Sequence, residues 1–90
     1  MRIDRFLYFI RLVKSRTLAQ ALLAEGYVRL DGRRVEKAAE EVRAGSVVAL
    51  PLRGKIRVLR VIELPTRRGP AAEARACYEE LGIDEGDGAS

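Results

Sequence analysis

The sequence has no histidine, and Cys77 is the one cysteine among its 90 residues. A catalytic cysteine needs a base beside it, usually histidine, so chemistry of that kind is excluded. A single cysteine forms no internal disulfide, which fits a reducing, cytoplasmic compartment. The chain also has no Cys/His cluster that would bind zinc and no glycine-rich nucleotide loop. We therefore expect no enzyme activity, no metal, no cofactor and no small-molecule substrate.

Long apolar runs are also missing. No stretch approaches the ~18 apolar residues that a membrane-spanning helix requires. The N-terminal segment is partly apolar, but Asp4, Arg5 and Arg11 interrupt it and no small-residue cleavage site follows, so it is not a signal peptide. With no internal repeat and no long linker, the sequence predicts one small domain that does not contact a membrane.

Acidic residues are scarce in the first two thirds of the chain. Residues 1–60 contain 14 Lys+Arg and 6 Asp+Glu, a balance of +8, whereas residues 61–90 contain 3 and 7, a balance of −4; the two sum to the net +4 of the chain. A basic body followed by an acidic end points to a polyanionic partner that is bound by the first part.

Two helices are predicted at the N-terminus. The first contains apolar residues at the i, i+3, i+4 and i+7 spacing of one helix face, namely Ile3, Phe6, Leu7, Ile10 and Val13. Ser15 is suited to be the N-cap of a second helix, and Gly26 is suited to end it. The expected buried stripe of the second helix consists of Leu18, Ala19, Leu22 and Leu23.

β-structure is predicted next. Residues 27–30 and 33–35 flank Asp31-Gly32, a dipeptide that accepts the positive φ of a tight hairpin. A short strand over residues 47–50 is expected to end at Pro51. A longer strand begins at residue 55, and its apolar side is expected to carry Ile56, Val58, Ile62 and Leu64.

The end of the chain is predicted to be helical and then flexible. Residues 71–81 are expected to form a last helix, with Pro70 near its first turn. Residues 82–90 are rich in glycine and acidic side chains, so we expect a flexible acidic tail. The predicted fold class is α+β: two N-terminal helices packed on a small, twisted, mainly antiparallel sheet, with a C-terminal helix.

The aromatic residues are few, and most are expected to pack rather than bind. Phe6 lies on the apolar stripe of the first helix and is predicted to be core. Tyr8 lies off that stripe, and its sequence position leaves packing and stacking on nucleic-acid bases equally open. Tyr27 is expected to pack where the second helix meets the hairpin. Tyr78 and Cys77 are expected to be packing residues of the last helix.

Cations crowd the start of the second helix, where Lys14, Ser15 and Arg16 follow one another. A helix N-terminus is already positive, so cations there repel it mildly unless an anion lies between them. A phosphate would accept from backbone N–H groups and the serine hydroxyl while the two cations neutralise it. Together with neighbouring residues of both helices and the hairpin, the candidate binding residues are Arg2, Arg5, Arg11, Lys14, Ser15, Arg16, Gln20, Arg33, Arg34 and Lys37.

Residues 2–50 resemble the alpha-L RNA-binding domain, also called the S-four domain. The resemblance is carried by Arg2-x-Asp4, by Ser15-Arg16 with Ala19, and by the ordered motifs Gly26-x-Val28, Asp31-Gly32 and Val42…Gly45. It implies an RNA-binding core over residues 1–50 and a C-terminal extension of the same domain over residues 51–81. The family often has asparagine where this chain has Asp31.

The segment TRRGPAAEARACYEE adds a resemblance to the small ribosome-associated heat-shock proteins. That resemblance implies binding of structured ribosomal RNA on the large ribosomal subunit and a role in ribosome rescue under stress, with the chain expected to act as a monomer. Two alternatives remain open: a targeting module for a separate RNA-modifying enzyme, and a helix-turn-helix module that binds DNA. Relatives of this group usually continue into a basic tail, whereas this sequence continues into GIDEGDGAS.

Overall fold

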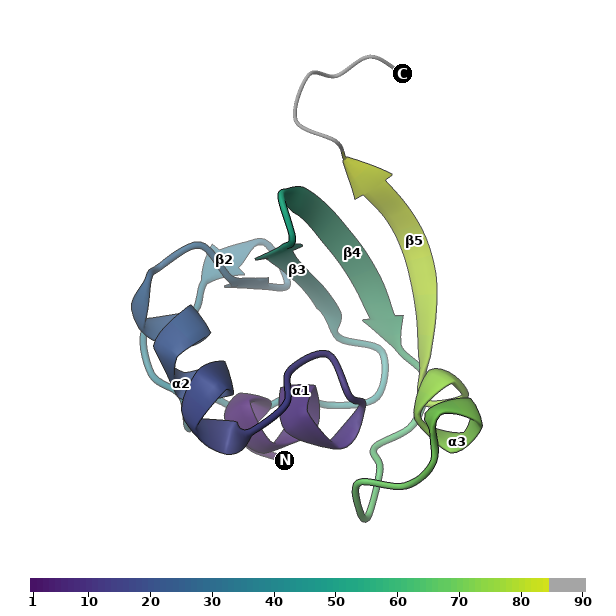
Figure 1. Cartoon of the computed structure of the whole chain (residues 1–90). Coiled ribbons are helices and arrows are strands. Elements are labelled where there is room, and N and C mark those ends of the chain that lie inside the picture. The colour runs from purple at the N-terminus through teal and green to yellow at the C-terminus, as the bar shows by residue number, and fades with distance from the viewer. Residues whose placement is uncertain (85–90) are drawn as a thin grey trace.

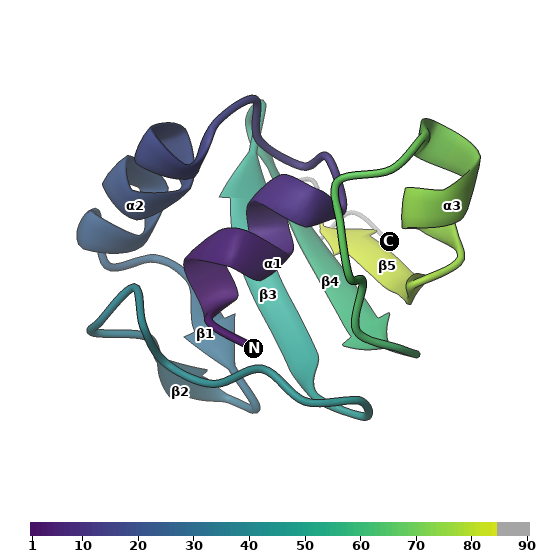
Figure 2. The same ribbon diagram turned by 90° about the horizontal axis from the view of Figure 1, so that it is seen from below.

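The N-terminal helices α1 (Ile3–Phe9) and α2 (Arg16–Ala24) lie on one face of a five-stranded sheet in the computed structural model, which describes residues 1–84 (Figures 1 and 2). The Ser15 hydroxyl oxygen accepts a hydrogen bond from the backbone N–H of Leu18 at 3.1 Å, so the predicted N-cap of α2 is confirmed. A turn of six residues joins the helices, and Figure 2 shows α1 crossing over β3 and β4.

The sheet is antiparallel throughout, with the strand order β2-β1-β3-β4-β5. Its strands are β1 (Arg29–Leu30), β2 (Arg33–Arg34), β3 (Val47–Leu52), β4 (Lys55–Val61) and β5 (Tyr78–Asp84), and the short helix α3 (Ala71–Arg75) precedes β5. The predicted hairpin is confirmed, because Asp31 (φ 53°) and Gly32 (φ 84°) form the tight turn between β1 and β2. The Asp31 carboxylate also accepts from the Val47 N–H at 2.9 Å, which fastens this turn to β3.

The core lies between the helices and the covered face of the sheet. Phe6 is fully buried, as predicted, and Ile3, Leu7 and Ile10 of the same stripe are buried with it. The buried apolar cluster comprises Ile3, Phe6, Leu7, Ile10, Ala19, Leu23, Val28, Leu30, Val35, Val42, Val48, Leu50, Leu59, Val61, Ala74 and Cys77. The α+β class is therefore confirmed, and the buried side of α2 is formed by Ala19 and Leu23 of its predicted stripe.

Three helix and strand details differ from the predictions. Helix α1 ends at Phe9, so Val13 lies in the connecting turn, and Leu18 of α2 is 51% exposed instead of buried. Strand β3 continues through Pro51 to Leu52. Proline is tolerated there because β1 pairs only with Val48 and Ala49, so Pro51 lies beyond the end of that pairing.

The inward side of β4 is the opposite of the predicted one. Leu59 and Val61 are buried, whereas Ile56 and Ile62 are 43% and 49% exposed. The register explains the difference, because Leu59 lies opposite the buried Val48, and directly opposed residues of an antiparallel pair share one face. The prediction that Tyr27 packs between the second helix and the hairpin is also wrong, since 70% of its surface is exposed.

The last predicted helix is wrong beyond Arg75. Helix α3 ends there, and β5 pairs along β4 from Tyr78 opposite Val61 to Asp84 opposite Ile56, with a bulge between the pairs of Val58 and Leu59. Pairing with the otherwise open edge of β4 overrides the local helical preference. Residues 82–84, which the sequence assigned to the flexible tail, belong to β5, and the rest of that tail lies outside the described residues.

Cys77 and Tyr78 do pack against the core, although from the α3–β5 junction and not from a helix. Within residues 1–84, no helix is long and apolar enough to cross a membrane.

We predict that deletion of residues 82–90 lowers the free energy of unfolding by about 1–3 kcal/mol, because three residues of β4 lose their partners. Deletion of residues 85–90 leaves β5 complete and serves as the control. Urea unfolding of the two truncated proteins measures the difference. Equal stability of the two would show that the end of β5 contributes nothing to the fold.

Candidate nucleic-acid interface

The carboxylate of Asp4 is fully buried and lies where α1 meets α2. Its Oδ2 atom accepts from Arg2 Nη2 at 3.0 Å, from Gln20 Nε2 at 3.0 Å and from Arg16 Nη2 at 3.4 Å. Its Oδ1 atom accepts from Arg2 Nε at 3.1 Å and from the backbone N–H of Arg5 at 2.7 Å. One carboxylate thus gathers three of the predicted binding side chains, and we call this arrangement the Asp4 cluster.

Burial alone would raise the pKa of Asp4, because desolvation disfavours the charged form. Hydrogen bonds from Gln20, Arg2, the Arg5 backbone and Arg16 outweigh that effect and lower the pKa from 3.8 to about 2. Asp4 is therefore a carboxylate at neutral pH.

The sequence builds the Asp4 cluster from short local spacings. Arg2 is the N-cap residue of α1, and Asp4 lies in the first turn of that helix. Arg16 begins α2, and Gln20 follows four residues later on the same helix face. The side chains of Arg2 and Arg16 remain 44% and 38% exposed, so each guanidinium keeps a surface on which an anion can bind.

One nitrogen of the Arg16 guanidinium, Nε, differs from the other donors of the Asp4 cluster. It is buried and has no hydrogen-bond partner among the described residues. Its Nη2 atom donates to the buried Asp4 carboxylate at 3.4 Å, which holds the guanidinium beside α1. A planar, pre-oriented guanidinium is well matched to a phosphate, which accepts two parallel N–H donors.

The other predicted residues of the helical region have different environments. Lys14 is exposed at the end of the α1–α2 turn, next to the Ser15 cap. The Arg5 side chain is exposed on α1. Arg11 is turned toward the C-terminal part of the chain, where its Nε donates to the Gly69 carbonyl at 2.6 Å. The structure therefore does not bring Arg11 into the Asp4 cluster.

The hairpin residues form a separate basic group. Arg33 and Arg34 are exposed on β2, and Lys37 is exposed just beyond it. The Glu40 carboxylate accepts from the backbone N–H groups of Glu36 at 2.8 Å and Lys37 at 3.3 Å, and these bonds with the nearby charges of Arg33 and Lys37 hold its pKa below the usual value. Glu40 therefore offsets part of the positive charge of this group.

The Tyr8 ring is covered by a cation from the C-terminal half. The Arg68 guanidinium carbon lies 4.7 Å from the centre of the ring, and its Nε donates to the Tyr8 carbonyl at 3.0 Å. Packing therefore accounts for the covered face of Tyr8.

The sequence analysis did not predict two roles: that of Asp4 as the centre of the cluster, and that of Arg68 as a contact of the α1–α2 region. Arg2-x-Asp4 and the four-residue spacing of Arg16 and Gln20 contain the information for the first, whereas no local pattern indicates the second.

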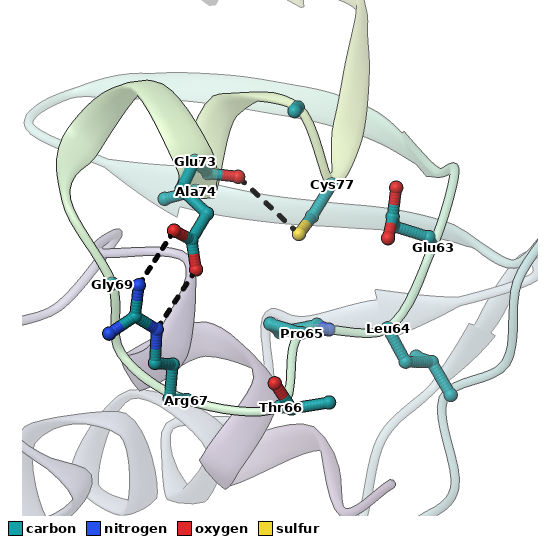
Figure 3. Close-up of a pocket in the computed structure, with 10 residues that line it drawn as sticks. Glu63, Leu64, Pro65, Thr66, Arg67, Gly69, Glu73, Ala74 and Cys77 are labelled. Atoms are coloured by element: carbon teal, nitrogen blue, oxygen red, sulfur yellow. Dashed lines mark hydrogen bonds and ion pairs between the residues drawn. The ribbon is translucent and has the colours of Figure 1, made fainter.

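A cavity of about 150 Å³ lies between the segment after β4 and α3 (Figure 3). Arg67 and Glu73 form an ion pair at 2.9 Å beside it, and Cys77 Sγ donates to the Glu73 carbonyl at 3.6 Å. Burial and the nearby carboxylates of Glu63 and Glu73 raise the pKa of the Cys77 thiol, which keeps it protonated and a weak nucleophile. In residues 1–84, no group of three His, Cys, Asp or Glu side chains converges to hold a metal ion.

Residues 1–48, which contain the Asp4 cluster, the Ser15 cap and the hairpin, match the S4 domain family. The chain belongs to the S4 domain family, and the resemblance drawn from its sequence is confirmed.

The relatives include members of two named groups, the heat shock protein 15 homologs and the RQC P-site tRNA stabilizing factors. The heat shock protein 15 homolog of Haemophilus influenzae is 29% identical over 80 residues, which cover 89% of this chain and 60% of that relative. The RQC P-site tRNA stabilizing factor of Bacillus subtilis is 31% identical over 87 residues, covering 94% of this chain and 100% of that relative. A trimeric structure of Vibrio cholerae heat shock protein 15 has a TM-score of 0.85 at 27% identity, covering 91% of this chain and 82% of that chain. This chain thus spans less than two thirds of the Haemophilus relative.

We predict that Asp4→Asn lowers the free energy of unfolding at pH 7 by about 2 kcal/mol, the value of a pKa shift of nearly two units. Because the folded pKa is below the unfolded one, the charged form stabilises the fold fully above pH 4. This stabilisation is lost as the pH falls through about 2, so the difference between variant and parent should shrink there.

Urea unfolding at several pH values between 7 and 2 tests this prediction. Glu25→Gln is the control, because Glu25 is an exposed carboxylate at the end of α2. A stability difference for Asp4→Asn that is independent of pH would contradict the charge-based explanation.

Proposed function

We propose that this chain is a non-catalytic protein that binds structured ribosomal RNA on the large ribosomal subunit and takes part in ribosome rescue under stress. The observation that carries the proposal is the Asp4 cluster, which holds Arg2, Arg16 and Gln20 together at the N-terminus of α2. We propose a cytoplasmic location, because the ribosome would be the target.

The geometry favours a phosphate at this position. Arg2 and Arg16 present partly exposed guanidinium groups, and the first N–H groups of α2 lie beside them. Lys14 adds an exposed cation at the same helix end. Gln20 carries an amide that donates to Asp4, so its contribution is to hold the cluster as much as to contact RNA directly.

The relatives support a ribosomal target. One of them is named for stabilising P-site tRNA, and another is named as a heat shock protein. A phosphate-directed site suits an RNA whose folded shape positions the backbone, because phosphate contacts fix the register while groove shape and 2′-OH groups distinguish RNA from DNA.

The first test compares polymers. The protein should bind a folded fragment of large-subunit ribosomal RNA more tightly than duplex DNA of equal length at the same salt concentration. Fluorescence anisotropy over a series of salt concentrations measures both affinities. Equal affinity for the two polymers at every salt concentration would leave only a general polyanion binder, and tighter binding of DNA would favour the helix-turn-helix alternative.

The second test removes single side chains. Arg16→Ala and Lys14→Ala should each weaken RNA binding by about 1–2 kcal/mol and make the salt dependence shallower by about one phosphate contact. Arg16→Ala also removes a donor to Asp4, so its affinity is measured where thermal melting shows a folded protein. Arg75→Gln is the control, because it removes an equal charge from exposed α3.

Ser15→Ala separates capping from phosphate binding. As a cap alone, the loss of the hydroxyl should cost about 1 kcal/mol of stability and leave the affinity of the folded protein unchanged. As a phosphate ligand, it should also lower affinity. If the Ser15, Arg16 and Lys14 variants all bind RNA like the parent, the Asp4 cluster is not the binding site, and the hairpin group of Arg33, Arg34 and Lys37 becomes the alternative.

We further propose that one chain is sufficient for this activity, because five hydrogen bonds from within the chain satisfy the buried Asp4 carboxylate. Light scattering at the concentrations used for RNA binding should then give the mass of a monomer. A trimer, as in the Vibrio cholerae structure, would contradict this part of the proposal.

A further inference from the structure

A second group of cations lies outside the site described above. The α1–α2 turn, the end of β3 and the start of β4 surround an open hollow of about 320 Å³. We call it the basic hollow, and its lining residues are Arg11, Leu12, Leu52, Arg53, Lys55 and Arg57. Four of these six residues are cationic, and they are brought together from segments about 40 residues apart in sequence.

Two of these cations have no carboxylate partner in the described part of the chain. Arg11 donates through Nε to the Gly69 carbonyl, which fixes the side chain but leaves its charge uncompensated. Arg53 is exposed at the turn between β3 and β4. Arg57 differs, because Glu80 pairs with it at 2.6 Å and holds its guanidinium in place. Cations collected in this way repel one another unless an anion joins them.

The backbone gives a second, independent observation. Among residues 1–84, positive φ occurs at three non-glycine residues: Arg11 at 65°, Asp31 at 53° and Arg53 at 53°. Aspartate is tolerated in this conformation, whereas a long side chain such as arginine adopts it rarely and at a cost of about 1 kcal/mol or more. Both strained arginines line the basic hollow. At Arg53 this conformation belongs to the two-residue Arg53-Gly54 turn between β3 and β4, and at Arg11 it follows the end of α1, so two turns each place an arginine on the hollow.

We propose that the basic hollow is a second phosphate-binding site, which takes a backbone phosphate of the bound RNA separately from the Asp4 cluster. The lining contains no aromatic residue on which a base stacks and no carboxylate or amide that reads a base edge. Its chemistry therefore selects the phosphate and not the sequence. The proposal rests on the RNA-binding function proposed above and adds a second point of contact to it.

The basic hollow differs from the Asp4 cluster in its residues and in what surrounds its cations. The Asp4 cluster is organised by a buried carboxylate, whereas the basic hollow has apolar walls in Leu12 and Leu52. Cations beside partly buried apolar surface are less hydrated, so their attraction for a phosphate is stronger than at an open surface. Two sites on one small domain would fix the direction in which the RNA crosses it.

Arg53→Asn is the decisive variant. Asparagine adopts positive φ readily, so this substitution removes the charge and relieves the backbone, and thermal melting should show no loss of stability. We expect it to raise the Kd for the folded ribosomal RNA fragment about fivefold or more and to make the salt dependence shallower by about one phosphate contact. Arg75→Gln, with the same change of charge on α3, should change the Kd less than twofold.

Combination with Arg16→Ala separates this proposal from the one on which it rests. If the two sites bind different phosphates, the fold-changes of Arg16→Ala and Arg53→Asn should multiply in the double variant. An effect of the double variant well below that product would place both arginines on one phosphate and overturn the second site. An effect of Arg53→Asn equal to that of Arg75→Gln would also overturn it, while the Arg16→Ala result would leave the proposed function intact. Failure of the parent to bind RNA at all would contradict both proposals.

Discussion

The fold and the proposed interface both depend on one buried ionic contact, that of Asp4 with the cations and amide of α1 and α2. A fully buried carboxylate is expensive unless it is surrounded by donors, and here five hydrogen bonds reach its two oxygens. Because Arg16 and Gln20 belong to α2, satisfying Asp4 also fixes the position of α2 against α1. The same contact thus stabilises the helix pair and orients the guanidinium groups that face solvent.

The second half of the chain contributes by holding the α1–α2 region from the other side. Arg68 donates to the Tyr8 carbonyl at 3.0 Å and to the Val13 carbonyl at 3.5 Å, while Gly69 accepts from Arg11. An added Cβ at Gly69 would lie 2.5 Å from Glu73 Oε1, so the exposed Glu73 side chain would have to move to admit it. The extension is therefore part of the scaffold that shapes the turn between the helices, even though the S4 domain match ends at residue 48.

The sequence predicts what depends on local physics and fails where distant pairing decides. The Ser15 cap, the Asp31-Gly32 turn and the burial of the α1 stripe from Ile3 to Ile10 follow from spacing and turn chemistry, and these are confirmed. The inward face of β4 and the strand β5 depend on the register with partners far along the chain, which no local pattern contains. For the candidate site, the sequence named Arg2, Arg16 and Gln20 individually, but their convergence on Asp4 requires two helices to be packed together.

The ion pairs in the structure change how the uneven charge of the sequence, basic before residue 60 and acidic after it, is interpreted. The acidic residues of the C-terminal third are not simply a repulsive end, because Glu73, Glu79 and Glu80 pair with Arg67, Arg60 and Arg57. These pairs compensate arginines of β4 and of the segment before α3. The positive charge near the α1–α2 region, at Arg2, Lys14, Arg16 and Arg53, is not reduced by those pairs. The surface that attracts a polyanion is therefore set by which cations the acidic residues can reach, and net charge alone does not locate it.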